Sequence, residues 1–320
     1  MNYDVVSLGE LLIDFISCGE SAQGNPVFEA NPGGAVVNVL AMLAKLGKKT
    51  GFIGKVGADM FGQQLAYALS SSGTDISGLV FDTEANTTLA FVQNFPDGDR
   101  EFSFYRNPGA DTLLLPDEVD MDMISDCRIF HFGTLSLTHQ PVKDATRKAI
   151  AAAKEMGKLL SFDPNLRPPL WETMDEAHSQ IDWGCSVCDI LKIADDELTF
   201  LSGYENTNEG IGFLRSRYPH MKLILLTKGA DGSEAYIGDC HVSRPAFKVK
   251  AIDTTGAGDT FFGCCLAYIL DCGIDNLCSD SLTEMLTLAN AAASLIATRK
   301  GALLSMPTRE EIDRALRSEI

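Results

Sequence analysis

The sequence Asp-Thr-Thr-Gly-Ala-Gly-Asp-Thr-Phe at residues 253–261 combines residue types that could move a phosphoryl group. Gly256, Ala257 and Gly258 carry almost no side chain, so their backbone N–H groups can close around an anion. The apolar residues 260–270 predict a helix, and its N-terminus would add partial positive charge at the same place. The segment therefore predicts a binding site for a phosphate-like anion.

Asp259 directly follows this anion-binding turn. A phosphate would repel a carboxylate there, so Asp259 is better placed to face the hydroxyl group that attacks the phosphate. That is the position of the general base in phosphoryl transfer. The spacing alone leaves a second interpretation open, because an aspartate that caps a helix after a glycine turn is common.

This segment closely resembles the C-terminal signature of the ribokinase (PfkB) family of carbohydrate kinases, and further motifs of that family follow in order along nearly the whole chain. The resemblance implies that Asp259 is the catalytic base and that Gly256, Ala257 and Gly258 form the anion hole. The two glycines would also contact the nucleotide. Neither a P-loop nor a Rossmann glycine fingerprint is present.

Two N-terminal motifs of the same family imply the sugar site. Asp14 ends a Gly-Glu-x-x-x-Asp motif, and its carboxylate could accept hydrogen bonds from two adjacent hydroxyl groups. Gly33 and Gly34 open a predicted helix at 36–46 and permit close approach of a ligand. Asn38 would offer its amide to the same ligand. Without the resemblance, Asp14 could simply end an element and Asn38 could face solvent.

Asp-Pro-Asn-Leu-Arg at residues 163–167 follows a predicted strand, at the strand end where α/β proteins bind ligands. This segment and the Pro-Pro-Leu-Trp after it resemble the fructokinase branch of the family. There the asparagine and the arginine lie near the sugar and the transferred phosphoryl group. The resemblance implies that Asn165 contacts the sugar and that Arg167 neutralises developing charge.

The turn Thr-Lys-Gly-Ala-Asp-Gly at residues 227–232 resembles the family's Thr-x-Gly-x-x-Gly turn, which contacts the phosphates of ATP. A helix at 282–298 carries small residues against which adenine or ribose could lie, although such residues usually serve helix packing. The predicted nucleotide contacts outside the anion hole are Lys192, Thr227, Gly229, Gly232 and Asn290.

The resemblance also implies two metal sites. Ribokinases organise Mg²⁺ through water with Asn-x-x-Glu, whereas this chain has Ala194 in place of the asparagine and keeps Glu197, with Asp195 or Asp196 nearby. The same acidic residues could instead form the first turn of a helix. A monovalent cation, and hence activation by K⁺, is expected at Asp253, Thr255, Gly301 and Ser305.

Strand–helix alternation predicts an α/β fold with a mostly parallel sheet flanked by helices on both faces. The resemblance implies that this fold is ribokinase-like and that residues 1–320 form a single domain. Residues 87–95 and 100–106 alternate around a Pro-Asp-Gly-Asp turn, which predicts a hairpin. Inserted strands at about 10–32 and 86–110 would form a small β-sheet lid that excludes water. Phe104 and Arg106 are its expected sugar contacts. In the family such lids pair between subunits, which implies a homodimer; the alternative is an ordinary surface hairpin.

Composition limits the partners and the location. The formal net charge of −18 over 320 residues argues against nucleic acid, whose binding needs lysine and arginine. The longest apolar run, residues 261–270, is too short to cross a membrane, and no membrane partner is expected. Nine scattered cysteines, with one isolated Cys-x-x-Cys, indicate reduced thiols of a cytoplasmic protein.

Together these features predict an ATP- and Mg²⁺-dependent sugar kinase, with D-fructose as acceptor and fructose 6-phosphate as product (EC 2.7.1.4). Alternative acceptors are 2-keto-3-deoxygluconate, whose carboxylate Arg167 could bind, ribose and aminoimidazole riboside. A phosphofructokinase would need more basic residues for its substrate phosphate than Arg106 and Arg167. A sugar sensor without catalysis is a further alternative, against which the intact Gly-Ala-Gly-Asp sequence argues.

Overall fold

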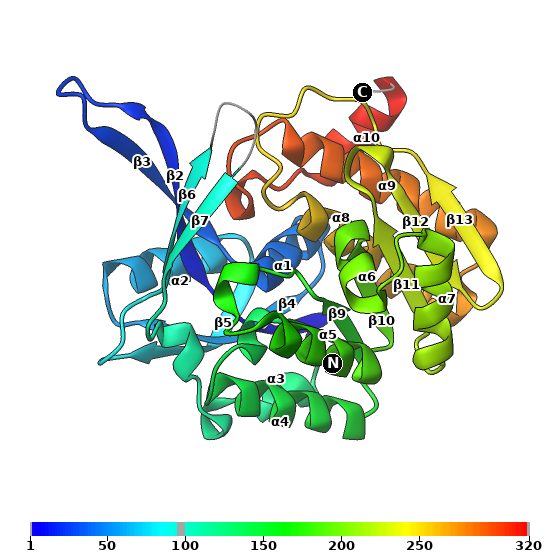
Figure 1. Cartoon of the computed structure of the whole chain (residues 1–320), viewed down its shortest axis with the longest axis horizontal. Helices are drawn as coiled ribbons and strands as arrows, with labels where there is room; N and C mark the ends of the chain where they lie inside the picture. The colour runs from blue at the N-terminus through cyan, green and yellow to red at the C-terminus, as the bar shows by residue number, and fades with distance from the viewer. Residues whose placement is uncertain (1, 95–99, 319–320) are drawn as a thin grey trace.

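The computed structural model describes residues 2–94 and 100–318, and its centre is a nine-stranded sheet (Figure 1). The strand order is β13-β12-β11-β10-β9-β8-β1-β4-β5, parallel from β11 to β5, with β12 and β13 antiparallel at one edge. The strands are β1 (Val5–Leu8), β4 (Thr50–Gly57), β5 (Thr74–Asp82), β8 (Ile129–Gly133), β9 (Leu159–Asp163), β10 (Ile190–Ala194), β11 (Leu223–Thr227), β12 (Ser233–Ile237) and β13 (Cys240–Arg244).

Helices cover both faces of this sheet (Figure 1), and on each face an apolar cluster packs between the helices and the sheet. One face carries α1 (Ala35–Lys45), α2 (Met60–Ser71), α8 (Ala257–Cys272), α9 (Ser279–Ala297) and α10 (Arg309–Ser318). The other face carries α3 (Met121–Ser125), α4 (Val142–Glu155), α5 (Met174–Val187), α6 (Asp195–Ser202) and α7 (Thr207–Arg217). The predicted α/β architecture is confirmed.

The central strands consist mostly of apolar residues because helices bury both of their faces. All four residues of β1 are buried, as are residues 190–193 of β10. Helix α8 is buried almost all round, since α1 packs on one side of it and α9 on another. A helix that is apolar on all sides is typical of a protein core. Because α8 is held there by its packing, the residues at its N-terminus are held in a defined position.

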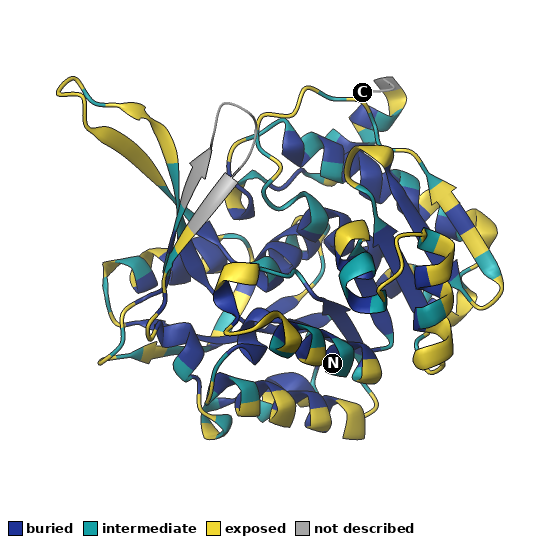
Figure 2. Cartoon of the chain, viewed as in Figure 1, coloured by how far each residue is buried: buried dark blue, intermediate teal, exposed yellow. Residues whose placement is uncertain are grey.

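A second, four-stranded sheet stands beside the main body, in the order β3-β2-β6-β7 (Figure 1). Its strands are β2 (Leu12–Glu20), β3 (Pro26–Gly33), β6 (Leu89–Asn94) and β7 (Arg100–Tyr105). β2 and β6 are parallel, and the other two pairs are antiparallel. The far end of the β2–β3 hairpin is exposed, as Figure 2 shows. The small sheet therefore forms from the two predicted insertions, while the predicted turn at 96–99 lies outside the described residues.

Among residues 2–94 and 100–318, no helix is both long enough and apolar enough to span a membrane. The longest, α9, has 19 residues and carries polar side chains such as Asn290 and Ser294.

Candidate active site

A cavity of about 260 Å³ lies between the second sheet, the N-termini of α1 and α8, and the carboxyl ends of β9 and β10. The carboxyl ends of parallel strands are the usual ligand-binding edge of an α/β sheet. The cavity brings together many of the predicted site residues: Asp14, Gly34, Asn38, Phe104, Asn165, Arg167, Lys192, Thr255, Gly256, Gly258 and Asp259.

Asp259 lies in the first turn of α8 and is 8% exposed. Asn38 of α1 donates a hydrogen bond from Nδ2 to Oδ2 of Asp259 at 2.8 Å. Burial raises the pKa of Asp259, while the Asn38 hydrogen bond and the charges of Lys192 and Arg167 oppose that rise. A buried carboxylate with one oriented oxygen and a raised pKa is a suitable general base.

Two glycines let the chain at the start of α1 pass close to the carboxylate of Asp14 and to the backbone carbonyl of Glu10. A Cβ on Gly33 would lie 2.2 Å from Oδ2 of Asp14, and Gly34 has φ 132 with Glu10 O only 2.5 Å from an added Cβ. Oε1 of Glu10 accepts a hydrogen bond from Ala35 N at 2.6 Å. Burial raises the pKa of Asp14 and of Glu10, each to about 7. Glu10 lines the cavity, although the sequence-based prediction did not include it.

The anion-binding turn is held in a conformation that favours glycine. Gly256 has φ 77 and caps α8, and a Cβ there would lie 2.6 Å from Cβ of Ala302. A Cβ on Gly258 would lie 3.1 Å from Nζ of Lys192. Ala257 does not line the cavity, and its N–H donates to Thr254 O at 3.2 Å. Gly256, Gly258 and the α8 N-terminus therefore face the cavity, and the predicted anion hole, Ala257 included, remains a prediction.

The loop after β9 carries further charged and polar groups into the cavity. Arg167 lines it and donates to its neighbour Leu166 O at 3.1 Å. Asn165 has the positive φ of 45, which is uncommon outside glycine. Glu197 holds the loop in place, because its carboxylate accepts from Leu166 N at 2.7 Å and from Ala194 N at 2.9 Å.

The residues predicted to hold a monovalent cation lie around Asp253. Its Oδ1 accepts from Thr255 N at 2.9 Å and from Thr255 Oγ1 at 2.7 Å, and its Oδ2 accepts from Gly301 N at 3.2 Å. Ser305 donates from Oγ to Lys300 O at 2.7 Å, beside Gly301. Carboxylate, hydroxyl and carbonyl oxygens are the ligands that hard cations prefer, so these residues fit K⁺ chemically.

The chain matches the pfkB family of carbohydrate kinases over residues 2–309. The protein belongs to this family. It is 43% identical over 310 residues to fructokinase-1 of Zea mays, covering 96% of each chain. Among solved structures, fructokinase of Xylella fastidiosa with bound ATP superposes with a TM-score of 0.90 at 31% identity, covering 100% of this chain and 99% of that one. A double mutant of Vibrio cholerae fructokinase in fructose, ADP and potassium ion bound form superposes at 0.86 with 27% identity, covering 98% of both chains.

Arg106 of this pfkB kinase is buried behind the cavity, and its predicted sugar contact remains a prediction. It is 3% exposed and does not line the cavity. Its guanidinium binds Asp111 at 2.6 and 2.8 Å, Thr138 Oγ1 at 2.9 Å and Leu135 O at 2.9 Å. In this arrangement Arg106 holds Leu135, which lines the cavity.

Asn290 is also hydrogen-bonded within the protein, and its adenine contact remains a prediction. Its Nδ2 donates to Arg244 O and Pro245 O at 3.2 and 3.1 Å, and its Oδ1 accepts from Ser233 Oγ at 2.9 Å. The amide is 4% exposed, so it fastens α9 to the antiparallel edge of the pfkB sheet. An amide whose donors and acceptor are bound within the protein has little left to offer adenine.

The predicted ATP turn joins β11 to β12, outside the residues that line the cavity. Thr227 ends β11, Gly229 has φ 52, and a Cβ on Gly232 would lie 2.1 Å from Arg244 O. This geometry fits a tight turn at the ligand-binding edge of the sheet, and the contact of the turn with ATP remains a prediction.

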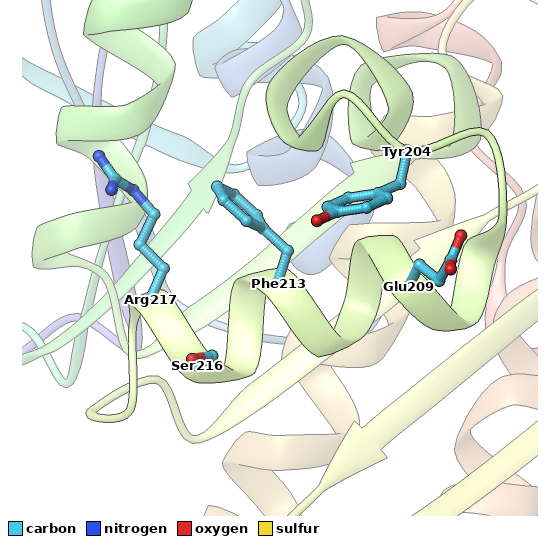
Figure 3. A pocket seen from close by; sticks show the side chains of 5 residues that line it. All are labelled: Tyr204, Glu209, Phe213, Ser216 and Arg217. Atoms are coloured by element: carbon cyan, nitrogen blue, oxygen red, sulfur yellow. The ribbon is translucent and has the colours of Figure 1, made fainter.

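A larger hollow of about 510 Å³ lies on α7, lined by Tyr204, Glu209, Phe213, Ser216 and Arg217 (Figure 3). Arg217 forms an ion pair with Asp182 at 2.6 Å, so the charge of its guanidinium is already paired. Few of the predicted site features are found there, because none of its lining residues belongs to the predicted site.

Proposed function

We propose that the protein is an ATP-dependent fructokinase that converts D-fructose and ATP to fructose 6-phosphate and ADP. The observation that carries this proposal is Asp259, a buried carboxylate at an anion-binding helix N-terminus, oriented by Asn38 within the cavity. The choice of fructose rests on the fructokinases that this chain resembles over 96% of its length, and on the fructose and ADP bound to the Vibrio cholerae enzyme.

The reaction begins when Asp259 takes the proton from the C6 hydroxyl of fructose. The C6 oxygen forms a bond to the γ-phosphorus of ATP, and the bond between that phosphorus and the β–γ bridging oxygen breaks. ADP leaves with the electron pair of that bond. Asn38 keeps the carboxylate of Asp259 turned toward the acceptor, so the rate gain comes largely from positioning.

Fixed positive groups stabilise the negative charge on the phosphoryl group as it is transferred. The N–H groups of Gly256 and Gly258 and the N-terminus of α8 provide partial charges, and Arg167 provides a full one. Groups oriented in advance stabilise a transition state without reorganising. Asp14, Gly33, Gly34, Asn165 and Phe104 form the sugar side.

Both expected metal ions fit the chain, in different ways. In the described residues no cluster of three or more His, Cys, Asp or Glu side chains is arranged to hold a metal, so the phosphates of ATP would hold Mg²⁺, with Glu197 orienting its water. Mg²⁺ supplies charge neutralisation at the phosphates. K⁺ would be held by the oxygens around Asp253 and would steady the turn at residues 254–258, a role consistent with the potassium ion of the Vibrio cholerae enzyme.

The second sheet would act as the lid. Leu12, Asp14 and Ile16 of β2 and Phe104 of β7 line the cavity, so this sheet can exclude water that would otherwise accept the phosphoryl group. Its exposed apolar residues, which include Phe28 at 38% and Tyr105 at 66%, suit pairing with a second subunit. A homodimer through the lid in the cytoplasm is therefore part of the proposal.

The proposal is tested by ADP release from ATP and Mg²⁺ over a panel of acceptors, with and without K⁺. The rate of ADP release should be much higher with fructose than with ribose, 2-keto-3-deoxygluconate or aminoimidazole riboside. Faster turnover of another acceptor would keep the mechanism and replace the substrate. Sugar binding without any turnover would contradict the proposal and favour a sensor.

A further inference from the structure

Two cysteines flank the connection between α8 and α9. Cys272 is the last residue of α8, and Cys278 immediately precedes α9 as its N-cap. Both are free thiols, of which Cys278 is exposed and Cys272 is half-buried. Asp259 stands in the first turn of α8, about 20 Å from Cys272 along the helix axis. The two thiols therefore lie outside the candidate active site.

The fold holds the two cysteines at the same end of an antiparallel helix pair. Helix α8 stops at Gly273, which has φ 82, and a turn at Ile274–Asn276 leads back into α9. The hydroxyl of Tyr268 donates to Oε2 of Glu284 at 2.8 Å and so ties the two helices together. Tyr268 and Cys272 are four residues apart, so both lie on the face of α8 that meets α9.

The two side chains are close enough to act on each other. Burial raises the pKa of Cys272, and the charges of Asp271 and Cys278 add to that rise. The residues between the two cysteines, 273–277, fold back on the end of α8, since Nδ2 of Asn276 donates to Cys272 O at 2.7 Å. The connection thus brings one thiol to the other.

The two thiols differ in reactivity. Hydrogen bonds from the backbone and the hydroxyl of Ser281, and from the backbone of Asp280, lower the pKa of Cys278. Oγ of Ser281 lies 3.6 Å from Sγ of Cys278. The thiolate is the form of cysteine that attacks oxidants, so Cys278 is suited to react first. Cys272, whose pKa is raised, is suited to react second.

From this arrangement we propose that Cys278 and Cys272 form a redox-active dithiol that a peroxide converts to a disulfide. The proposal goes beyond the kinase function and does not depend on it. The thiolate of Cys278 attacks one oxygen of hydrogen peroxide, the O–O bond breaks, and the departing hydroxide takes a proton and leaves as water. Cys278 is then a sulfenic acid.

The second step closes the disulfide. The sulfur of Cys272 attacks the sulfenic sulfur of Cys278, the S–O bond breaks, and the departing hydroxide takes the proton of Cys272 and leaves as water. The two thiols together lose two electrons, which the peroxide gains. A thiol reductant returns both cysteines to the reduced form by thiol–disulfide exchange.

The surroundings of the pair favour a neutral oxidant. Asp271 and Glu284 lie near Cys272, and Asp280 lies near Cys278. Their negative charges disfavour the approach of an anionic oxidant such as glutathione disulfide, whereas hydrogen peroxide is small and uncharged. The disulfide would close a short ring across the α8–α9 connection and stabilise the fold by restricting the unfolded chain.

The experiment treats wild type, Cys272→Ser, Cys278→Ser and a control with hydrogen peroxide, blocks remaining thiols with N-ethylmaleimide, and maps the peptides by mass spectrometry without reductant. The control is Cys18→Ser, which removes another exposed thiol, on β2. Wild type and the control should form the disulfide between Cys272 and Cys278, and dithiothreitol should reverse it. In Cys272→Ser, Cys278 should stop at the sulfenic acid, which dimedone traps. In Cys278→Ser, Cys272 should remain a thiol. Oxidised wild type should melt about 5 °C above the reduced protein.

Peroxide-treated wild type in which N-ethylmaleimide still labels both Cys272 and Cys278 would overturn the proposal. Oxidation of Cys18 as fast as that of Cys278 would also overturn it, because the surroundings of Cys278 would then add nothing. An unchanged melting temperature after complete oxidation would overturn the stabilising role of the bond. These readouts are independent of turnover, so a protein that does not phosphorylate fructose would contradict only the proposed function.

Discussion

Nδ2 of Asn38 donates to Oδ2 of Asp259 at 2.8 Å, across 221 residues of sequence. The bond exists because α1 and α8 pack against each other with their N-termini at the same cavity. Asn38 follows the glycines of the sugar side, and Asp259 follows the glycines of the anion-binding turn. One hydrogen bond therefore links the residues that face the acceptor to the residues that face the phosphate.

Asp259→Asn should abolish most of the turnover and leave binding intact. The amide has nearly the shape of the carboxylate but cannot accept the proton of the acceptor hydroxyl. We expect kcat to fall by about 10²- to 10⁴-fold, the usual contribution of a general base. Steady-state ADP release measures kcat, and calorimetry with fructose and ADP checks binding. Near-normal turnover would remove Asp259 from the mechanism.

Asn38→Leu should change the pH dependence of the reaction. The Asn38 hydrogen bond lowers the pKa of Asp259 against the effect of burial, so its loss raises that pKa further. Asp259 must be deprotonated to act as the base, and activity is lost as the pH falls through its pKa. The acid limb of kcat/KM for fructose should therefore move to higher pH, measured between about pH 5 and pH 9. An acid limb at the wild-type position would show that Asn38 does not act on Asp259.

Gly33→Ala should weaken fructose binding selectively. The new Cβ would meet Oδ2 of Asp14 at 2.2 Å, so the carboxylate that faces the sugar must move. We expect KM for fructose to rise by about tenfold or more, the cost of roughly one good hydrogen bond to a charged group, with KM for ATP little changed. Gly212→Ala is the control, because a Cβ there meets nothing within 4 Å. Equal behaviour of the two variants would refute the assignment of Asp14.

Glu10→Gln should stabilise the protein at alkaline pH. Burial raises the pKa of Glu10 from 4.5 to about 7, so above that pH the folded protein carries a buried charge that the unfolded chain exposes to water. Stability from this group is therefore lost as pH rises from the unfolded pKa through the folded pKa. The variant should melt at a higher temperature than wild type near about pH 8, and the difference should vanish near about pH 4.5. A difference independent of pH would contradict the buried charge.

Arg106→Met should destabilise the protein strongly. It leaves Asp111, which is 3% exposed, without the guanidinium that binds it. Breaking a buried pair typically costs about 3–5 kcal/mol, whereas Lys148→Met, at the exposed pair with Asp117, should cost about 0–1 kcal/mol. Urea unfolding measures both. Unchanged stability of Arg106→Met together with a large rise in KM for fructose would restore the predicted sugar contact.

The sequence was sufficient to predict those parts of the fold and of the site whose chemistry and backbone conformation depend on residues close together in the chain. The α8 turn, the glycines before α1 and the continuous apolar strands could be placed because each motif lies within about ten residues. The parallel sheet followed from strand–helix alternation, and the second sheet followed from two alternating segments. Strand β5 was not identified, because Gly78 interrupts its mixed pattern, and the antiparallel edge strands β12 and β13 were also missed.

The contacts that sequence reasoning missed at the site involve side chains whose partners are distant in sequence or were not considered. Asn290 is satisfied by Ser233, 57 residues away, and Lys192 is paired with Asp163, 29 residues away. Neither pairing is visible in the order of residues. For Arg106 a signal existed, since Asp111 follows five residues later. Glu10 could have been found as well, because it belongs to the same Gly-Glu-x-x-x-Asp motif as Asp14, and both residues line the cavity.

The central claim is that Asp259 drives transfer of the γ-phosphoryl group to the C6 hydroxyl of fructose. Phosphorus NMR of a reaction with fructose, ATP and Mg²⁺ tests it most directly, with wild type and Asp259→Asn run in parallel. The account predicts ADP and fructose 6-phosphate as matched products for wild type and almost none for the variant. A phosphate ester at another hydroxyl, or equal product from both proteins, would contradict it.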